Sequence, residues 1–375
     1  MLIRNAQVFL GRTFRTGEDI RIHNGHVQEI GHNLEAGLYE SVVDAQEDYV
    51  IPGFVDVHIH AFRGHDTMEG EEAVRKMSRD LYQMGVAAFC PTTMSASVED
   101  TKKAVDGIRA VMERPDEQSA MVLGAHMEAP YLSEQKAGAQ RKEFFMDPDI
   151  TSFDSMVGGE DNYGAIRMIT MAPERTGSEE MIRYLTEKGI IVSVGHSAAT
   201  ASLLHASGDW GANHVTHTFN AQTPILHRAP GIPGAAMVDD RFYCEMICDG
   251  VHLDGDIVRM ICKCKGPGRT VVITDAMEAA GMPDGHYALG GQPVFVKDGQ
   301  ARLEDGTLAG SVLTMKRALE NLIHRFDVQP EDAVQMCTAT PANSVGEKLA
   351  GRITAGAPAP LTRWSKDWTF KEILA

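Results

Sequence analysis

The strongest constraint on the fold is an alternation that runs from residue 51 to about residue 280. Eight short apolar runs are separated, for the most part, by longer stretches with helical patterns, such as 71–85 and 97–113. Strands that are apolar throughout are typical of parallel sheets buried on both faces, and their alternation with helices indicates βαβ units. We therefore predict an α/β fold, a (β/α)₈ TIM-type barrel. The eight runs are FVDVHIH, VAAFCPTT, MVLGAHME, AIRMITMAPE, IIVSVGH, NHVTHTF, FYCEMICDGVH and TVVITDAM.

Both ends of the chain have a different pattern. Residues 1–51 and 346–375 consist of short strand-like runs and turns. The economical arrangement is a small β-sandwich domain that the two ends build together beside the barrel. The barrel would then occupy residues 52–345, with a β-hairpin insertion near 281–308 that follows its eighth strand.

Charge and composition exclude some classes of partner. The chain has 35 Lys and Arg against 52 Asp and Glu, which gives a net charge of −17 and disfavours binding to nucleic-acid backbones or anionic membranes. No apolar run reaches the length of about 18 residues that a membrane span needs, and the six cysteines form no zinc-type pairs. We expect a cytoplasmic protein that binds neither nucleic acid nor membrane, with reduced, structural cysteines.

Polar residues stand at the ends of six of the eight apolar runs. One histidine at such a place is often a hydrogen-bonded core residue, but unpaired burial of His, Asp or Glu costs several kcal/mol, so packing does not explain the set. His58 and His60 are two residues apart and share one face of the first strand. Barrels of this kind place their active sites at the carboxyl ends of the strands. The other strand ends carry Glu128, His196, His217, His252 and Asp275.

This set of residues predicts a metal centre. Histidine and carboxylate ligands without thiolate suit Zn²⁺ or Fe²⁺, with Mn²⁺ and Co²⁺ as alternatives, and do not select among them. A bound metal lowers the pKa of water to about 7 and so supplies hydroxide at neutral pH. Asp275 is the natural general base, because it can take a proton from that water and return it to a leaving amine. The reaction class that follows is metal-assisted hydrolysis.

Several longer segments resemble a known family. PGFVDVHIH, HMEAPYLS, KAGAQ, VGHS, HTFNAQTPILHRAPGI, DGVHL, ITDAM and LAGSVLTM follow the order of the amidohydrolase superfamily and most closely resemble its N-acetylglucosamine-6-phosphate deacetylase branch. The resemblance covers nearly the whole chain. It implies that Glu128, His196 and His217 bind the principal metal. His58 and His60 match the pair that holds a second ion in members that have one, so one or two ions per subunit are expected.

The resemblance also implies a substrate. It implies hydrolysis of the acetamide of N-acetyl-D-glucosamine 6-phosphate, a phosphosugar, with Asp275 as the catalytic acid and base. Arg228 and His252 match residues that hold the sugar phosphate; in the family the arginine comes from the neighbouring subunit, so a homodimer is expected. Gln140 stands where some members have a histidine that polarises the amide carbonyl, and a glutamine can donate a hydrogen bond there but carries no charge. Further positions that match substrate-contacting segments are Ala139, Asn220, Ala221, Leu308, Ala309 and Gly310.

Two alternatives to this function remain open. Gln140 leaves room for the same chemistry on N-acetylgalactosamine 6-phosphate or on another N-acyl substrate. An inactive homologue that serves as a scaffold is the more remote alternative, and the presence of five candidate metal ligands together with Asp275 argues against it.

Overall fold

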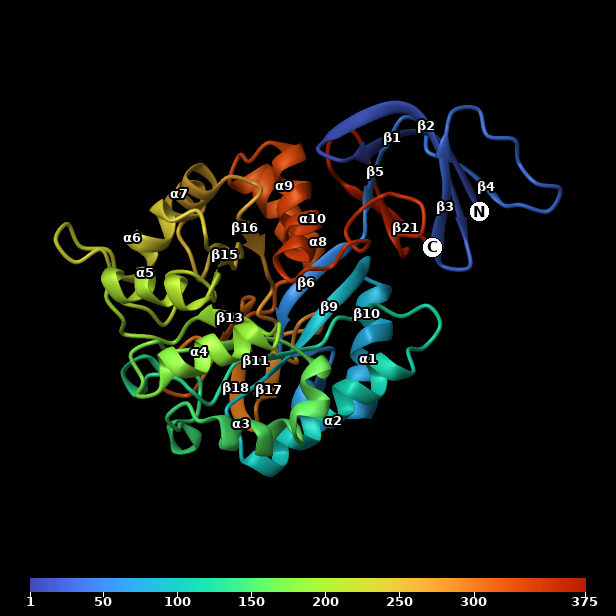
Figure 1. Cartoon of the computed structure of the whole chain (residues 1–375). Coiled ribbons are helices and arrows are strands. Elements are labelled where there is room, and N and C mark those ends of the chain that lie inside the picture. Colours follow the sequence, from blue (N-terminus) through green and yellow to red (C-terminus); the bar gives the residue numbers. More distant parts are fainter.

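The computed structural model describes all residues from 1 to 375, and it contains a barrel with a smaller sheet beside it (Figure 1). The predicted barrel is confirmed, since eight parallel strands pair in chain order. Backbone hydrogen bonds from Asp275 to the carbonyl of His58 and from His60 to the carbonyl of Ala276 (2.9 and 3.0 Å) join the last strand to the first. The strands are β6 (Phe54–Ile59), β9 (Val86–Thr93), β10 (Met121–Val122) continued by β11 (Ala125–Met127), β12 (Ile166–Met171), β13 (Ile191–Val194), β14 (His214–Val215), β15 (Tyr243–Met246) and β16 (Thr270–Val272).

Helices cover the outside of the barrel (Figure 1). None of them is both long enough and apolar enough to cross a membrane. They are α1 (Glu71–Tyr82), α2 (Val98–Glu113), α3 (Ile150–Val157), α4 (Ser178–Glu187), α5 (Ala201–Trp210), α6 (Gly231–Val238), α7 (Gly255–Lys265), α8 (Met315–Glu320), α9 (Pro330–Cys337) and α10 (Ala339–Ser344), with short 3₁₀ turns at Thr67–Glu69, Glu134–Lys136, Lys142–Phe144 and Glu160–Ala165 and a π-helical turn at Asn321–Arg325.

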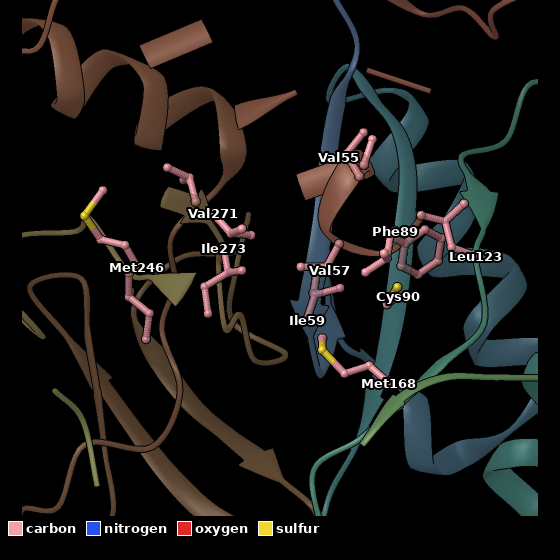
Figure 2. Close-up of a cluster of buried hydrophobic side chains, with 14 of the residues drawn as sticks. Val55, Val57, Ile59, Phe89, Cys90, Leu123, Met168, Met246, Val271 and Ile273 are labelled. Atoms are coloured by element: carbon pink, nitrogen blue, oxygen red, sulfur yellow. The ribbon is translucent and has the colours of Figure 1, made fainter. Parts of the chain in front are cut away.

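In the first barrel strand, a row of apolar side chains lies on one face and the histidines of the candidate site lie on the other. Val55, Val57 and Ile59 are buried in the main apolar core, and Figure 2 shows them along β6 among other core side chains. Alternate residues of a strand point to opposite faces. His58 and His60 therefore face the other way, towards the interior of the barrel.

The two ends of the chain build one sheet of seven strands, which confirms the expected β domain from both termini. β20 pairs antiparallel with β5, so the blue and red strands lie together in Figure 1. The domain limits of 1–51, 52–345 and 346–375 stay a prediction. The strands are β1 (Leu2–Leu10), β2 (Thr13–His23), β3 (His26–Gly31), β4 (Val42–Asp44), β5 (Tyr49–Pro52), β20 (Leu361–Trp364) and β21 (Phe370–Leu374).

Three antiparallel strands form a separate small sheet after the eighth barrel strand: β17 (Gly285–Leu289), β18 (Gln292–Lys297) and β19 (Gln300–Arg302). The turn between the first two is tied to loops of the barrel. The backbone N–H of Gly290 donates to Asp66 (3.3 Å), in the short hairpin of β7 (Ala61–Phe62) and β8 (His65–Asp66), and the side chain of Gln292 donates to the carbonyl of Ala139 (2.7 Å). The small sheet is thereby held against the carboxyl ends of the barrel strands.

Candidate active site

Three of the polar strand ends bring their ligand atoms together in the interior. Nε2 of His217 lies 3.0 Å from Oε1 of Glu128 and 3.1 Å from Nε2 of His196, and the third side of this triangle is 3.3 Å. The three side chains are buried. Two donors about 2.1 Å from a tetrahedral metal ion lie roughly 3.4 Å apart. The spacing of these three atoms therefore fits one metal ion between them.

A second group of ligand atoms shares the same carboxylate. Nε2 of His58 and Nε2 of His60 are 3.4 Å apart, and Oε2 of Glu128 lies 3.2 Å from His60. Oδ1 of Asp275 is also 3.2 Å from Nε2 of His60. Glu128 thus lies between two groups of donors, each of which could hold a metal ion.

The hydrogen bonds of the outer ring nitrogens support a metal as the occupant. In three of the four histidines, Nδ1 faces an oxygen that can only accept, so Nδ1 carries a proton and Nε2 is the nitrogen directed into the site. Metal-ligating histidines are usually oriented by such a partner. The partners are Glu245 for His58 (3.0 Å), the carbonyl of Thr92 for His60 (3.2 Å) and the carbonyl of Lys136 for His196 (2.8 Å).

His126, on β11, is close to these residues but does not fit as a ligand. Its Nδ1 lies 3.2 Å from the carbonyl of Val57, and its Nε2 lies 2.7 Å from the hydroxyl of Thr170. Both ring nitrogens are therefore hydrogen-bonded, and burial holds the pKa of His126 well below its usual value. We assign it to the packing of the barrel interior, behind His58.

The electrostatics of the site favour a positive occupant. Burial alone would raise the pKa of Glu128, but the neighbouring imidazoles of His58 and His196 hold it well below its usual range. Burial alone would lower the pKa of His60, yet Asp275 and Glu128 raise it to about 9. The pKa of Asp275 falls to about 2, because His58 and His60 outweigh its burial. Clustered carboxylates of this kind attract protons or a metal ion.

Several site residues have a backbone conformation that side chains other than glycine rarely adopt. His196, His217 and Asp275 have φ angles of 44°, 27° and 50°. Each follows the end of its strand by two or three residues. Such conformations cost of order 1–3 kcal/mol each and persist only where the surrounding structure fixes them. They turn these side chains out of the strand direction and towards the common site.

A cavity of about 360 Å³ opens beside these groups. It brings together twelve of the residues predicted from the sequence. They are His60, Glu128, Ala139, Gln140, His196, His217, Asn220, Ala221, His252, Asp275, Leu308 and Gly310.

Three predicted residues do not line this cavity. His58 is fully buried behind His60. Ala309 is also fully buried, in a small apolar cluster with Met277 and others. Arg228 is exposed, and its guanidinium lies 2.8 Å from Nε2 of His227 on the same loop.

Gln140 makes contacts that its sequence position does not predict. Its Oε1 accepts a hydrogen bond from the backbone N–H of Ser95 (2.7 Å), which fixes the orientation of the amide. Its Nε2 then donates to Oε2 of Glu128 (2.6 Å) and lies 3.5 Å from the sulfur of Met94. The amide is thus directed at a candidate metal ligand rather than held free for a substrate carbonyl.

His252 supplies a positive group to the cavity. Its Nδ1 lies 2.7 Å from Oδ2 of Asp249. The other oxygen of Asp249 accepts hydrogen bonds from the backbone N–H groups of Val251 and His252 (2.8 and 2.9 Å). Burial alone would lower the pKa of His252, but Asp249 raises it above the usual value.

Sequence reasoning missed six residues that line the cavity. Gly138 is one for which a signal exists: it has a φ of +58°, and a Cβ there would lie 3.3 Å from the ring of His196, so a glycine in this polar loop is itself informative. The others come from loops whose position depends on the folded structure. They are Met94, Gln135, Lys136, Leu289 and Thr307.

Comparison with known proteins agrees with this geometry. A family model described as the amidohydrolase family matches residues 49–373. The chain belongs to the amidohydrolase family. This amidohydrolase is 33% identical to the N-acetylglucosamine-6-phosphate deacetylase of Bacillus subtilis (strain 168), over 93% of this chain and 89% of the relative. It is 34% identical to the N-acetylgalactosamine-6-phosphate deacetylase of Escherichia coli O157:H7, over 85% and 84% of the two chains.

A solved structure gives the same result for the fold. The amidohydrolase is similar to a mutant N-acetyl-D-glucosamine-6-phosphate deacetylase from Mycobacterium smegmatis in complex with N-acetyl-D-glucosamine-6-phosphate. The TM-score is 0.90 and the identity 31%, with 100% of this chain and 97% of the other covered. The resemblance expected from the sequence motifs is thereby confirmed.

The shared position of Glu128 leads to a prediction about metal binding. Replacing the carboxylate by an amide in Glu128→Gln should weaken binding of Zn²⁺ by more than roughly 100-fold, beyond the 10- to 100-fold that is typical for groups outside the ligand set. A competition titration of the metal-free protein against a chromophoric chelator measures this. His32→Gln, which alters an exposed histidine, is the control. A Glu128→Gln variant that binds Zn²⁺ as the control does would contradict the assignment.

Proposed function

We propose that this amidohydrolase is a metal-dependent deacetylase that hydrolyses the acetamide of N-acetyl-D-glucosamine 6-phosphate to glucosamine 6-phosphate and acetate. The observation that carries the proposal is that Asp275 and both groups of candidate metal ligands adjoin one cavity that also contains His252. Relatives that cover most of the chain carry this name. A cytoplasmic location is proposed with it, because six unpaired cysteines suit a reducing compartment.

The donor set fits a divalent transition metal. Glu128, His196 and His217 would hold the principal ion, for which Zn²⁺ or Fe²⁺ is the first choice and Mn²⁺ or Co²⁺ the alternative. His58 and His60 would hold a second ion. When bound, such an ion supplies Lewis-acid chemistry, which lowers the pKa of water and polarises a carbonyl oxygen.

Asp275 would move the proton. Its low pKa keeps the carboxylate ionised at neutral pH, so it can accept a proton as a water oxygen bonds to the acetamide carbon. The carbon–nitrogen bond then breaks, and the proton passes from Asp275 to the departing nitrogen. Acetate and the amine in its ammonium form are the products, since the second proton of the water also passes to the nitrogen, and Asp275 returns to its starting state.

Two positive groups are assigned to the sugar phosphate. His252 belongs to the cavity of its own chain, whereas Arg228 is exposed on a loop outside it. Leu226 on the same loop is 57% exposed, and Val238 at the end of α6 is 76% exposed. These exposed apolar side chains support a homodimer in which Arg228 reaches the cavity of the neighbouring subunit. A guanidinium offers fixed, permanently charged donors that suit a phosphate.

The galactosamine epimer is the second candidate substrate. The relative from Escherichia coli O157:H7 is named for that epimer. Gln140 replaces a histidine that some family members have, and this difference leaves the choice between the two epimers undecided. The two phosphorylated epimers are compared by their kcat/KM ratio in one assay, because specificity is the ratio of these values.

The function is tested by acetate release from N-acetylglucosamine 6-phosphate by the metal-loaded protein. Asp275→Asn cannot accept the proton, so its kcat should fall by roughly 10²- to 10⁴-fold, with metal content measured on the same sample. Asp256→Asn, at a highly exposed site, is the control. An unchanged rate in Asp275→Asn contradicts the proton transfer, and equal turnover of unphosphorylated N-acetylglucosamine contradicts the phosphate contacts.

His252 leads to a pH prediction. Its pKa is raised, so the imidazolium that attracts phosphate is present at low pH and persists above the usual value near 6.5. Asp249 and Asp275 favour the charged form, and Arg302 opposes it. The KM for the phosphosugar should therefore increase as pH rises through the raised pKa, while KM for the unphosphorylated sugar does not show this increase. In His252→Gln the increase should disappear, and its persistence would exclude His252 as the source.

The dimer is tested by mixing two defective variants. Arg228→Ala lacks the cation but retains Asp275, and Asp275→Asn lacks the base but retains Arg228. If the arginine acts across the interface, random exchange of subunits should restore about a quarter of wild-type activity, because each mixed dimer has one complete site. No gain on mixing, under conditions where exchange is demonstrated by a labelled subunit, would place Arg228 in its own chain's site or in none.

A further inference from the structure

One buried carboxylate near the site has no part in the reaction described above. Glu245 is the third residue of β15, and it lies between Cys244 and Met246 with no exposed surface. It does not line the cavity, so it does not contact the substrate. Burial of an unpaired carboxylate is costly, so its contacts should explain its presence.

Both hydrogen bonds of the Glu245 side chain are made by Oε2 to candidate metal ligands, and its Oε1 has no partner. Its Oε2 lies 3.0 Å from Nδ1 of His58 and accepts a hydrogen bond from the backbone N–H of His217 (3.1 Å). The two histidines come from different strands and belong to different groups of ligand atoms. We propose that Glu245 is a positioning residue that fixes one histidine of each group and so couples the two metal positions. This inference rests on the metal centre of the proposed function.

The contact with His58 sets the tautomer of that ring. The carboxylate of Glu245 accepts a hydrogen bond from the N–H at Nδ1, so in the neutral ring Nε2 keeps its lone pair. That lone pair then points to the interior, where Nε2 lies 3.4 Å from Oε1 of Glu128 and 3.4 Å from Nε2 of His60. His58 is fully buried, so Glu245 rather than bulk solvent is the partner of its Nδ1.

The contact with His217 acts on the backbone instead. With a φ of 27°, His217 is in a strained conformation that needs support from its surroundings. Its backbone N–H donates to Oε2 of Glu245 (3.1 Å), which is one such support. Nδ1 of His217 has no partner. Outside the ligand group, His217 is held near His196 and Glu128 by this bond to Glu245 and by the hydrogen bonds that its carbonyl accepts from Asn220 (2.9 and 3.3 Å).

Glu245 itself does not fit as a metal ligand. It forms a cluster with His58 and His126, but both nitrogens of His126 are hydrogen-bonded and Nδ1 of His58 is bonded to Glu245. Both nitrogens of His126 and the nitrogen of His58 that faces Glu245 are therefore already engaged, and in this cluster Oε1 of Glu245 alone lacks a partner.

The test compares Glu245→Gln, Glu245→Leu and wild type in titrations of the metal-free proteins with Zn²⁺. Glu245→Leu removes both contacts, so the affinity for Zn²⁺ should fall by roughly 10- to 100-fold. The larger loss is expected at the metal position formed by His58 and His60. Glu245→Gln retains an acceptor without charge, so its loss should be smaller. Thr270→Val is the matched control, because Thr270 is buried on the adjacent strand and its hydroxyl has no partner. The visible spectrum of each Co²⁺-loaded protein reports whether the coordination geometry changes.

The outcomes separate this inference from the proposed function. A wild type that binds no metal and releases no acetate overturns the proposed function. A metal-loaded wild type with Glu245→Gln and Glu245→Leu unchanged in stoichiometry, affinity and Co²⁺ spectrum overturns only the role of Glu245. If Glu245→Leu does not fold, as judged by near-ultraviolet circular dichroism, Glu245→Gln decides: weaker metal binding with Thr270→Val unchanged supports the proposal, and unchanged binding refutes it.

Discussion

The structure of the site depends on the burial of one negative charge. The carboxylate of Glu128 lies in the barrel interior with almost no exposed surface, and an ionised carboxylate there is tolerated only with charged or hydrogen-bonding partners. Four imidazoles and the amide of Gln140 provide them. The imidazoles come from three different strands of the barrel. The closed sheet is what brings these partners to within hydrogen-bonding distance of one carboxylate, and removal of any of these three strands would leave the charge without part of its shell.

Precision at this place has a conformational cost. Three of the residues to which the proposed function assigns the chemistry, His196, His217 and Asp275, have positive φ angles, as do Phe219 and Ala221. Such residues are stable only if neighbouring contacts hold them. The barrel below supplies that support, since its apolar core is continuous around the strands. The site therefore consists of strained residues held by a rigid barrel. This suits catalysis, because the site residues need little rearrangement when a substrate binds.

The sequence was informative where chemistry and strand position coincide. The apolar runs predicted the barrel, and polar residues at their ends predicted candidate ligand atoms, neighbouring pairs of which lie 3.0–3.4 Å apart. The contacts of Gln140 could not be predicted, because its partners Ser95 and Glu128 come from other strand ends, and such long-range pairs have no local pattern. Glu245 did carry a signal: a carboxylate in the middle of the run FYCEMIC is expensive unless it is paired. The cost of burying an unpaired charge thus points to functional residues in the interior of a strand as well as at its end.

The pairing of β5 with β20 has a consequence for synthesis of the chain. β5 lies immediately before the first barrel strand, and its antiparallel partner is made about 300 residues later. At roughly 5–20 residues per second, that edge of the sheet emerges from the ribosome and then stays without its partner for about 15–60 s. Unpaired edges are sites of aggregation, so this arrangement makes the N-terminal strands the vulnerable part of the nascent chain. The last fifteen residues are thus both the segment that covers this edge of the sheet and the last part of the chain to be made.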